Sequence, residues 1–88
     1  MVRQWGSFHR TDTHLPGVVS RNLRRLRGER ELSMSKVASG AGVGIHAYVG
    51  WEEGRCLPNI TALVQLANFY EVSIDYLVGR TEKREVNR

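Results

Sequence analysis

Apolar residues recur at helical spacing through most of the chain that follows residue 17. Val19, Leu23 and Leu26 fall on one stripe, which Arg30 extends, because residues three and four apart share one face of a helix. This pattern predicts a first helix that starts at Val18 and ends near residues 28–31. Four arginines lie off the stripe and are expected to face solvent: Arg21, Arg24, Arg25 and Arg27.

Two short helices are predicted next, separated by glycine. Ser33 is an expected N-cap, because its hydroxyl can accept a free backbone N–H of the following turn, and Ser35 is a second candidate. The predicted buried edge of the second helix consists of Val37, Ala38 and Ala41. Gly42 is expected to end that helix, since glycine adopts a left-handed conformation at little cost. The third helix is predicted from Ile45 to Glu53, with Gly54 as its stop.

The strongest helical pattern lies in residues 60–70. Asn59 precedes it and is an expected N-cap. The stripe of apolar residues is wide, which predicts a largely buried helix. Its apolar positions are Ile60, Leu63, Val64, Leu66, Ala67, Phe69 and Tyr70. Ser73 is expected to cap a short fifth helix over residues 74–78, which Gly79 ends. No segment alternates as a strand does, so the sequence predicts an all-α domain of five helices.

The remaining segments flank this domain. Residues 1–17 are polar and end in Leu15-Pro16-Gly17. Pro-Gly is typical of turns and does not continue a helix, so these residues are expected to form a flexible N-terminal arm. Residues 18–79 form the predicted domain. Residues 80–88 are charged and are expected to be a frayed C-terminal tail.

Composition narrows the range of partners. The 88 residues carry 13 Lys and Arg against nine Asp and Glu, a net charge of +4. A basic balance favours an anionic partner, and nucleic acid is preferred to a membrane because no apolar run approaches the roughly 20 residues that span a bilayer. The single cysteine, Cys56, cannot form an internal disulfide. The expected compartment is a reducing cytoplasm.

The central segment has the spacing of a helix-turn-helix. Such a motif needs a small residue where its two helices cross, a tight turn and an apolar residue that pins the corner to the core; Ala38, Gly42 and Val43 meet these needs in order. Its second helix needs an apolar inner face, for which the sequence offers Ala47 or Tyr48, together with Trp51.

On these residues the chain resembles the Cro and lambda-repressor-like helix-turn-helix family, often called the XRE family. The resemblance runs from about Val19 to Gly79. Besides the central segment, it rests on Trp51-Glu52, Gly54-Arg55, Pro58, Leu63, Leu66-Ala67 and the block of residues 72–79, VSIDYLVG. It implies a five-helix lambda-repressor-like domain that binds double-stranded DNA as a transcriptional regulator, more often a repressor, and as a homodimer.

The resemblance also implies which residues touch DNA. The third helix would enter the major groove and present Gly44, Ile45, His46, Val49 and Gly50 to the bases. Ser35, Lys36 and Arg55 would hold phosphates. In this chain only His46 of the base-facing set can hydrogen-bond a base edge, whereas Ile45 and Val49 can contact thymine methyl groups. Gly40 and Gly50 each lower helix stability by about 1 kcal/mol relative to alanine, which implies a close contact or a packing demand.

A second function remains open on the same residues. Exposed Ile45 and Val49 beside glycines suit close packing of a protein partner, so the chain is alternatively a protein-interaction module or an antitoxin-like partner with weakened DNA binding. No nucleophile, metal or phosphate-loop motif is present, and the pair His9 and His14 falls short of the three or four ligands that a metal needs. Neither an enzyme nor a cofactor is expected. The expected dimer surface is the fifth helix with residues 80–88.

Overall fold

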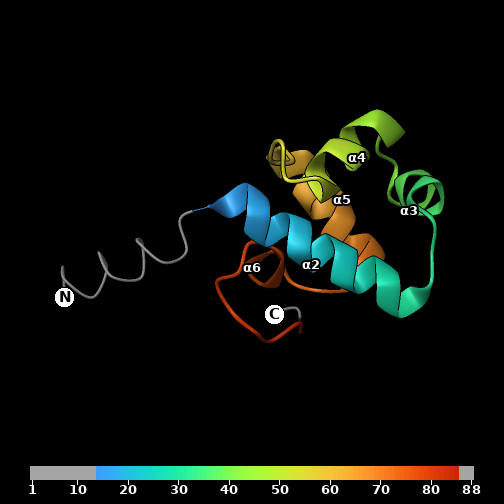
Figure 1. Cartoon of the computed structure of the whole chain (residues 1–88). Coiled ribbons are helices and arrows are strands. Elements are labelled where there is room, and N and C mark those ends of the chain that lie inside the picture. The colour runs from blue at the N-terminus through green and yellow to red at the C-terminus, as the bar shows by residue number, and fades with distance from the viewer. Residues whose placement is uncertain (1–13, 86–88) are drawn as a thin grey trace, which may run out of the picture.

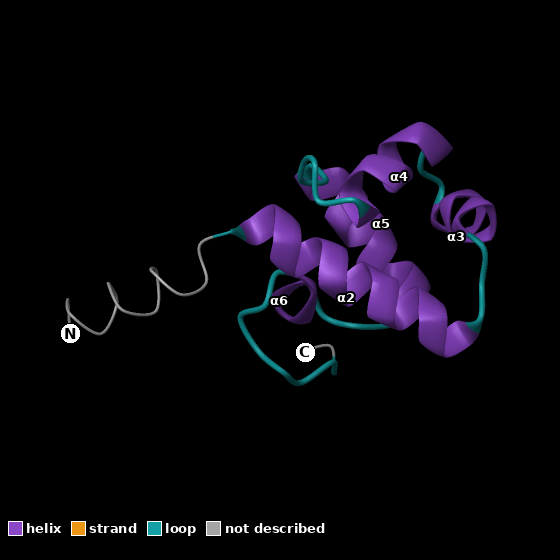
Figure 2. Ribbon diagram, viewed as in Figure 1, coloured by secondary structure: helices purple, strands orange, loops and turns teal. Residues whose placement is uncertain are grey.

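Helices account for most of the chain in the computed structural model, which describes residues 14–85. Within that part the helices are α2 (Leu15–Arg30), α3 (Met34–Ala41), α4 (Ile45–Glu52), α5 (Ile60–Tyr70) and α6 (Ile74–Leu77), as Figure 1 shows. No strand occurs in the described residues (Figure 2). The predicted all-α fold of five helices is therefore confirmed.

Local side-chain chemistry starts three of these helices as predicted. The caps are Ser33, which accepts from Lys36 N at 3.1 Å, Asn59, which accepts from Ala62 N at 2.8 Å, and Ser73, which accepts from Tyr76 N at 3.0 Å. Each cap satisfies a backbone N–H that has no partner within its own helix.

The start of α2 differs from its prediction. The helix begins at Leu15 instead of Val18, with Pro16 in its first turn. Proline suits that turn because its fixed φ is already helical and its missing N–H would have no partner there. The prediction that Leu15-Pro16-Gly17 ends an arm is thus wrong, and the rest of the predicted arm, residues 1–13, lies outside the described part.

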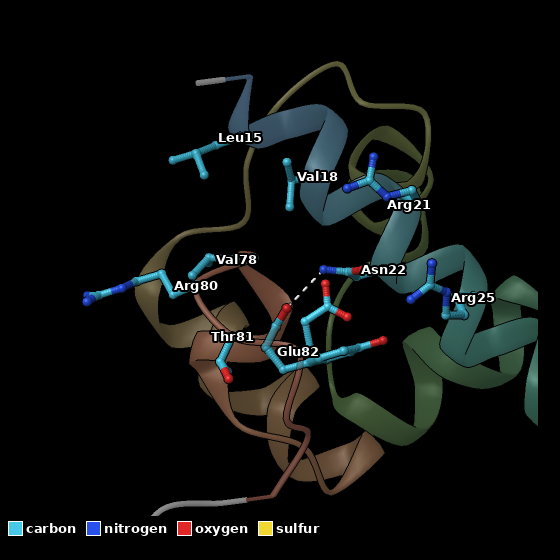
Figure 3. A pocket seen from close by; sticks show the side chains of 11 residues that line it. Leu15, Val18, Arg21, Asn22, Arg25, Val78, Arg80, Thr81 and Glu82 are labelled. Atoms are coloured by element: carbon cyan, nitrogen blue, oxygen red, sulfur yellow. Dashed lines mark hydrogen bonds between the residues drawn. The ribbon is translucent and has the colours of Figure 1, made fainter. Parts of the chain in front are cut away.

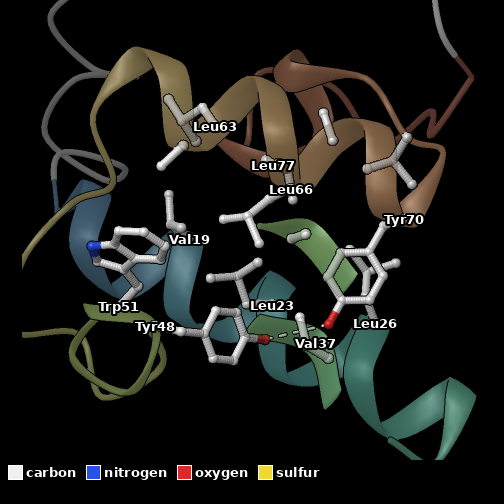
Figure 4. Packing of buried hydrophobic residues seen from close by; sticks show 14 of the residues in the cluster. Val19, Leu23, Leu26, Val37, Tyr48, Trp51, Leu63, Leu66, Tyr70 and Leu77 are labelled. Atoms are coloured by element: carbon white, nitrogen blue, oxygen red, sulfur yellow. Dashed lines mark hydrogen bonds between the residues drawn. The ribbon is translucent and has the colours of Figure 1, made fainter. Parts of the chain in front are cut away.

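The core lies between α2 and the other helices. α2 packs on α4 and on α6, while α3 packs on α4 and α5. The stripe Val19, Leu23 and Leu26 is buried as predicted, and Figure 4 shows it facing Trp51, Leu66 and Leu77 across the interior.

The prediction that the helix of residues 60–70 is largely buried is only half correct. One face of α5 is buried, but Ile60 keeps 72% and Val64 keeps 40% of its surface exposed. The reason is that α5 packs chiefly on α3 and α6, which leaves its remaining face open in the described residues. Apolar breadth in the sequence therefore overstated the burial of this helix.

The start of the charged tail is folded back on the domain. The guanidinium of Arg84 donates to both carboxylate oxygens of Glu29, at 2.7 and 2.8 Å, and the Arg84 carbonyl accepts from Ser73 N at 2.8 Å. The guanidinium also stacks 5.1 Å from the centre of the Tyr76 ring. Donation from Arg84 holds the pKa of Glu29 below its ordinary value. The prediction of a frayed tail is wrong for residues 80–85.

A buried carboxylate joins α2 to α4. The Glu52 side chain is only 1% exposed, and it accepts from Arg27 Nε, from Arg27 Nη2 at 3.0 Å and from the Tyr48 hydroxyl at 2.6 Å. The Tyr48 hydroxyl also lies 3.3 Å from that of Tyr70 (Figure 4). One expectation is corrected, because Arg27 does not face solvent but directs its guanidinium to the buried Glu52 carboxylate.

This network predicts a loss of stability at alkaline pH. Burial, followed by the hydrogen bond to Glu52, raises the pKa of Tyr48, and burial also raises the pKa of Tyr70. Both phenols stay protonated in the fold, while in the unfolded chain they ionise near pH 10. Their contribution is therefore complete below about pH 10 and is lost as the pH rises further.

Urea unfolding followed across this pH range checks that sign. The free energy of unfolding should fall above about pH 10, and Tyr48→Phe should reduce the slope of that fall. An equal slope in wild type and Tyr48→Phe would mean that Tyr48 ionises in the folded state as easily as in the unfolded one.

Candidate nucleic-acid interface

The corner between α3 and α4 is fixed by backbone hydrogen bonds. Gly42 adopts a left-handed conformation with φ of 78°, and the N–H groups of Gly42 and Val43 donate to the Ala38 carbonyl at 3.0 and 2.9 Å. Val43 is half-buried against the core, and Ala38 is only 3% exposed. The roles predicted for the three residues of this corner are thus confirmed.

The first turn of α4 is open to solvent. Gly44, which serves as N-cap without a side chain, and the following Ile45, His46 and Ala47 are all exposed. Tyr48 lies inside, so of the two residues offered for the inner face it is the one that packs there. Helical spacing from Trp51 allows either residue, since Tyr48 lies three and Ala47 four positions before it, so packing decided which of them is buried.

The second half of α4 is less exposed than its first turn. Val49 is half-buried and Gly50 is buried. A Cβ built on Gly50 would lie 3.4 Å from Arg55 Nη2 and 3.5 Å from Cys56 Sγ, so the loop after α4 covers this position. The expectation that Gly50 faces outward to the bases is therefore wrong, because residues 55 and 56 fold back over the helix.

The three residues expected to hold phosphates are all at the surface. Ser35 and Lys36 are exposed in the first turn of α3. Arg55 is exposed in the loop after α4, where its Nε donates to Glu53 Oε1 at 2.9 Å in an exposed ion pair. An exposed pair contributes little to stability, so the Arg55 side chain can leave Glu53 at small cost.

The two helical glycines predict opposite effects of alanine. At Gly50 the new methyl group would make ordinary contacts, so Gly50→Ala should stabilise the domain by up to about 1 kcal/mol through helix propensity. At Gly40 it would overlap the ring of Phe69, so Gly40→Ala should destabilise. Thermal unfolding of both variants measures the difference, and a gain in melting temperature for Gly40→Ala would show that the ring moves aside freely.

The described residues offer neither a metal site nor a membrane span. Among residues 14–85, no three His, Cys, Asp or Glu side chains converge as metal ligands would. None of the described helices combines the length and the apolar composition that a membrane crossing requires.

Known proteins resemble the chain over this same region. The model of a family described as a helix-turn-helix domain matches residues 20–82. The chain is 41% identical over 65 residues to the cryptic phage CTXphi transcriptional repressor RstR of Vibrio cholerae. This alignment covers 74% of the chain and 59% of RstR.

Two relatives come from Bacillus subtilis (strain 168). The chain is 38% identical over 60 residues to the uncharacterized HTH-type transcriptional regulator YobD, covering 68% of this chain and 54% of that protein. It is 30% identical over 63 residues to the HTH-type transcriptional regulator AnsR, covering 72% and 54%. The aligned region thus spans 54–59% of the length of these three relatives. No solved structure matches the chain.

Proposed function

The chain belongs to the family of helix-turn-helix domains, and from this premise we propose that it regulates transcription by binding a specific sequence of double-stranded DNA. The observation that carries the proposal is the α3–α4 corner. Backbone hydrogen bonds to the Ala38 carbonyl fix this corner, while the first turn of α4 is exposed to solvent. The major groove of B-DNA is about 12 Å wide and admits a helix presented in this way.

The proposed base contacts come from the exposed turn. His46 would hydrogen-bond a base edge, and Ile45 would pack on a thymine methyl group. The space beside Gly44 is open, because a Cβ built there would meet no protein atom within 4 Å. The DNA backbone at the edge of the groove would occupy this space. Val49 is half-buried and adds at most an edge contact, whereas the buried Gly50 no longer belongs to the proposed set.

The proposed phosphate contacts come from either side of that turn. Ser35 and Lys36 at the start of α3, and Arg55 beyond the end of α4, supply a hydroxyl and two cations at the surface. Phosphate contacts fix the register of a protein on the duplex and supply salt-dependent affinity.

We further propose repression, carried out by a homodimer in the bacterial cytoplasm at the nucleoid, with neither catalysis nor a cofactor. RstR, the relative with 41% identity, is named as a transcriptional repressor, which supports this choice. Two-fold symmetric dimers of this motif read half-sites about 34 Å apart.

Selection from a random duplex pool, repeated at several salt concentrations, tests the proposal. The expected result is an enriched motif of two half-sites about one helical turn apart, bound with an affinity that falls steeply with salt. Failure to bind any duplex at low salt would reject DNA binding.

The second candidate, a protein-interaction module of the antitoxin type, is favoured by one observation. Residues 44–51 of the exposed corner and α4 contain no charged side chain. Binding of a protein partner through Ile45 and Ala47 would depend only weakly on salt, so the same salt series separates the two functions.

A further inference from the structure

The outward face of α5 carries apolar side chains that nothing in residues 14–85 covers. Ile60 keeps 72% of its surface exposed, and Val64, one turn later on the same face, keeps 40%. Leu63 and Leu66, from the opposite face of this helix, are buried in the interior (Figure 4). A helix that is apolar on both faces has more apolar surface than this domain buries, which indicates a partner for the outward face.

A groove lies beside this face, between α5 and α6. It has a volume of about 270 Å³, and Val64 and Ile74 both line it. Ile74 is the first residue of α6 and keeps 37% of its surface exposed. Ile60, Val64 and Ile74 therefore form one apolar surface, the α5–α6 patch. They are three of the six large apolar side chains that are exposed in residues 14–85, so half of these side chains gather in one place.

The chain around the α5–α6 patch carries almost no charge. Residues 56–70 contain no Asp, Glu, Lys or Arg. Among the described residues that line the groove only Asp75 is charged, and it is exposed to solvent. In a two-fold symmetric dimer the same patch lies on both copies, so a charge at its centre would face its like. An uncharged patch avoids this repulsion, whereas a different protein is usually oriented by complementary charges. The absence of charge therefore favours a second copy of this chain as the partner.

A larger hollow elsewhere on the domain suits a second copy less well. It has a volume of about 420 Å³ and is lined by residues of α2, of α6 and of the segment 78–82 (Figure 3). Arg21 and Arg25 from α2 are part of its lining, so a symmetric contact there would bring the guanidinium groups of both copies together. The segment after it is already engaged within one copy, because Arg84 pairs with Glu29.

We propose that the α5–α6 patch is the surface through which two copies of this chain form a homodimer. The inference rests on the proposed function, which uses two copies on paired half-sites, and it names the surface that joins them. None of the three patch residues belongs to the proposed DNA contacts, so the two surfaces do not compete for the same side chains. The predicted fifth helix thus contributes Ile74, while α5 takes the place that was predicted for residues 80–88.

Sedimentation equilibrium of the whole chain without DNA tests this surface. Wild type should form a dimer as its concentration rises. Ile60→Asp should raise the dissociation constant of the dimer by about tenfold or more, because it replaces apolar contacts with carboxylates that face each other. Ile60 is the first residue of α5, where an acidic side chain suits the helix dipole, so this variant should keep its fold.

Leu15→Asp is the matched control. Leu15 is the first residue of α2, is 39% exposed and lies outside the patch, so the substitution has the same chemistry at the same helix position. It should leave the dissociation constant unchanged. Urea unfolding of both variants is measured alongside, because a loss of association counts only in a folded protein.

Cross-linking tests the same surface without adding charge. Val64→Cys and Ser39→Cys are each combined with Cys56→Ser, since Cys56 is exposed and would react. Val64 lies in the patch, whereas Ser39 is exposed on α3, outside it. A short bismaleimide should link two copies through Val64→Cys and not through Ser39→Cys, because residues near a two-fold axis lie close to their own counterparts.

Three results would overturn the proposal. The first is wild type that stays monomeric at every concentration, in which case the patch would serve a different protein. The second is an equal dissociation constant for folded Ile60→Asp and Leu15→Asp, and the third is equal linkage through Val64→Cys and Ser39→Cys. Duplex selection fails or succeeds separately: duplex binding without this dimer would reject only the surface, and this dimer without duplex binding would reject only the proposed function.

Discussion

Arg27→Met is expected to destabilise the domain by about 3–5 kcal/mol, which would leave little of a small domain's stability. The substitution keeps much of the side chain's apolar stem but removes both donors to the Glu52 carboxylate. That carboxylate is 1% exposed and would keep only the Tyr48 hydroxyl as a side-chain donor. The urea midpoint measures the loss.

Arg24→Met is the matched control. Arg24 lies one turn earlier on α2 and is exposed, and it makes a single hydrogen bond of 3.3 Å, to the Glu52 backbone carbonyl. Its replacement should cost no more than about 1 kcal/mol. The double variant Arg27→Met/Glu52→Leu should recover much of the loss, since removing both partners leaves no buried charge. Equal midpoints for Arg27→Met and Arg24→Met would refute the proposed importance of the buried pair.

Lys36→Ala and Arg55→Ala should each weaken binding to all duplexes by a similar factor. Each should also lower the slope of log affinity against log salt by about one, because each removes one phosphate contact and the counterion released with it. Titration of the selected duplex and of a scrambled duplex over a salt series measures both quantities.

Two neighbouring substitutions sharpen this test of roles. Glu53→Gln removes the carboxylate that pairs with Arg55 and repels phosphate, so it should tighten binding to both duplexes. His46→Ala should change the preference between the duplexes and leave the salt slope unchanged. If Arg55→Ala altered preference while His46→Ala altered the slope, the two assigned roles would have to be exchanged.

Local patterns determined most of the secondary structure. The caps Ser33, Asn59 and Ser73, and the left-handed Gly42, act on backbone groups within a few residues of themselves, so the sequence predicted them correctly. The same holds for the buried stripe of α2 and for the helix-turn-helix spacing, since both depend on residues that are close together in the chain.

Tertiary contacts decided the residues whose partners are far away in the chain. Arg27 reads as one solvent-facing arginine among several, and its partner Glu52 lies 25 positions later. Arg84 reads as part of a loose tail, yet it pairs with Glu29 at a separation of 55. No period along a helix encodes such pairs, because they exist only once two distant segments lie side by side.

Some features of the candidate site also follow from the sequence, and others depend on tertiary packing. The sequence alone determined that α4 follows a tight turn, and its resemblance to a known family implied that Ser35, Lys36, Ile45 and His46 lie at the surface, where the structure has them exposed. Only the packed structure decided that the loop after α4 covers Gly50, and that Arg55 of this loop pairs with Glu53. Covering and pairing depend on which surfaces meet, and periodicity within one helix carries no information about its neighbours.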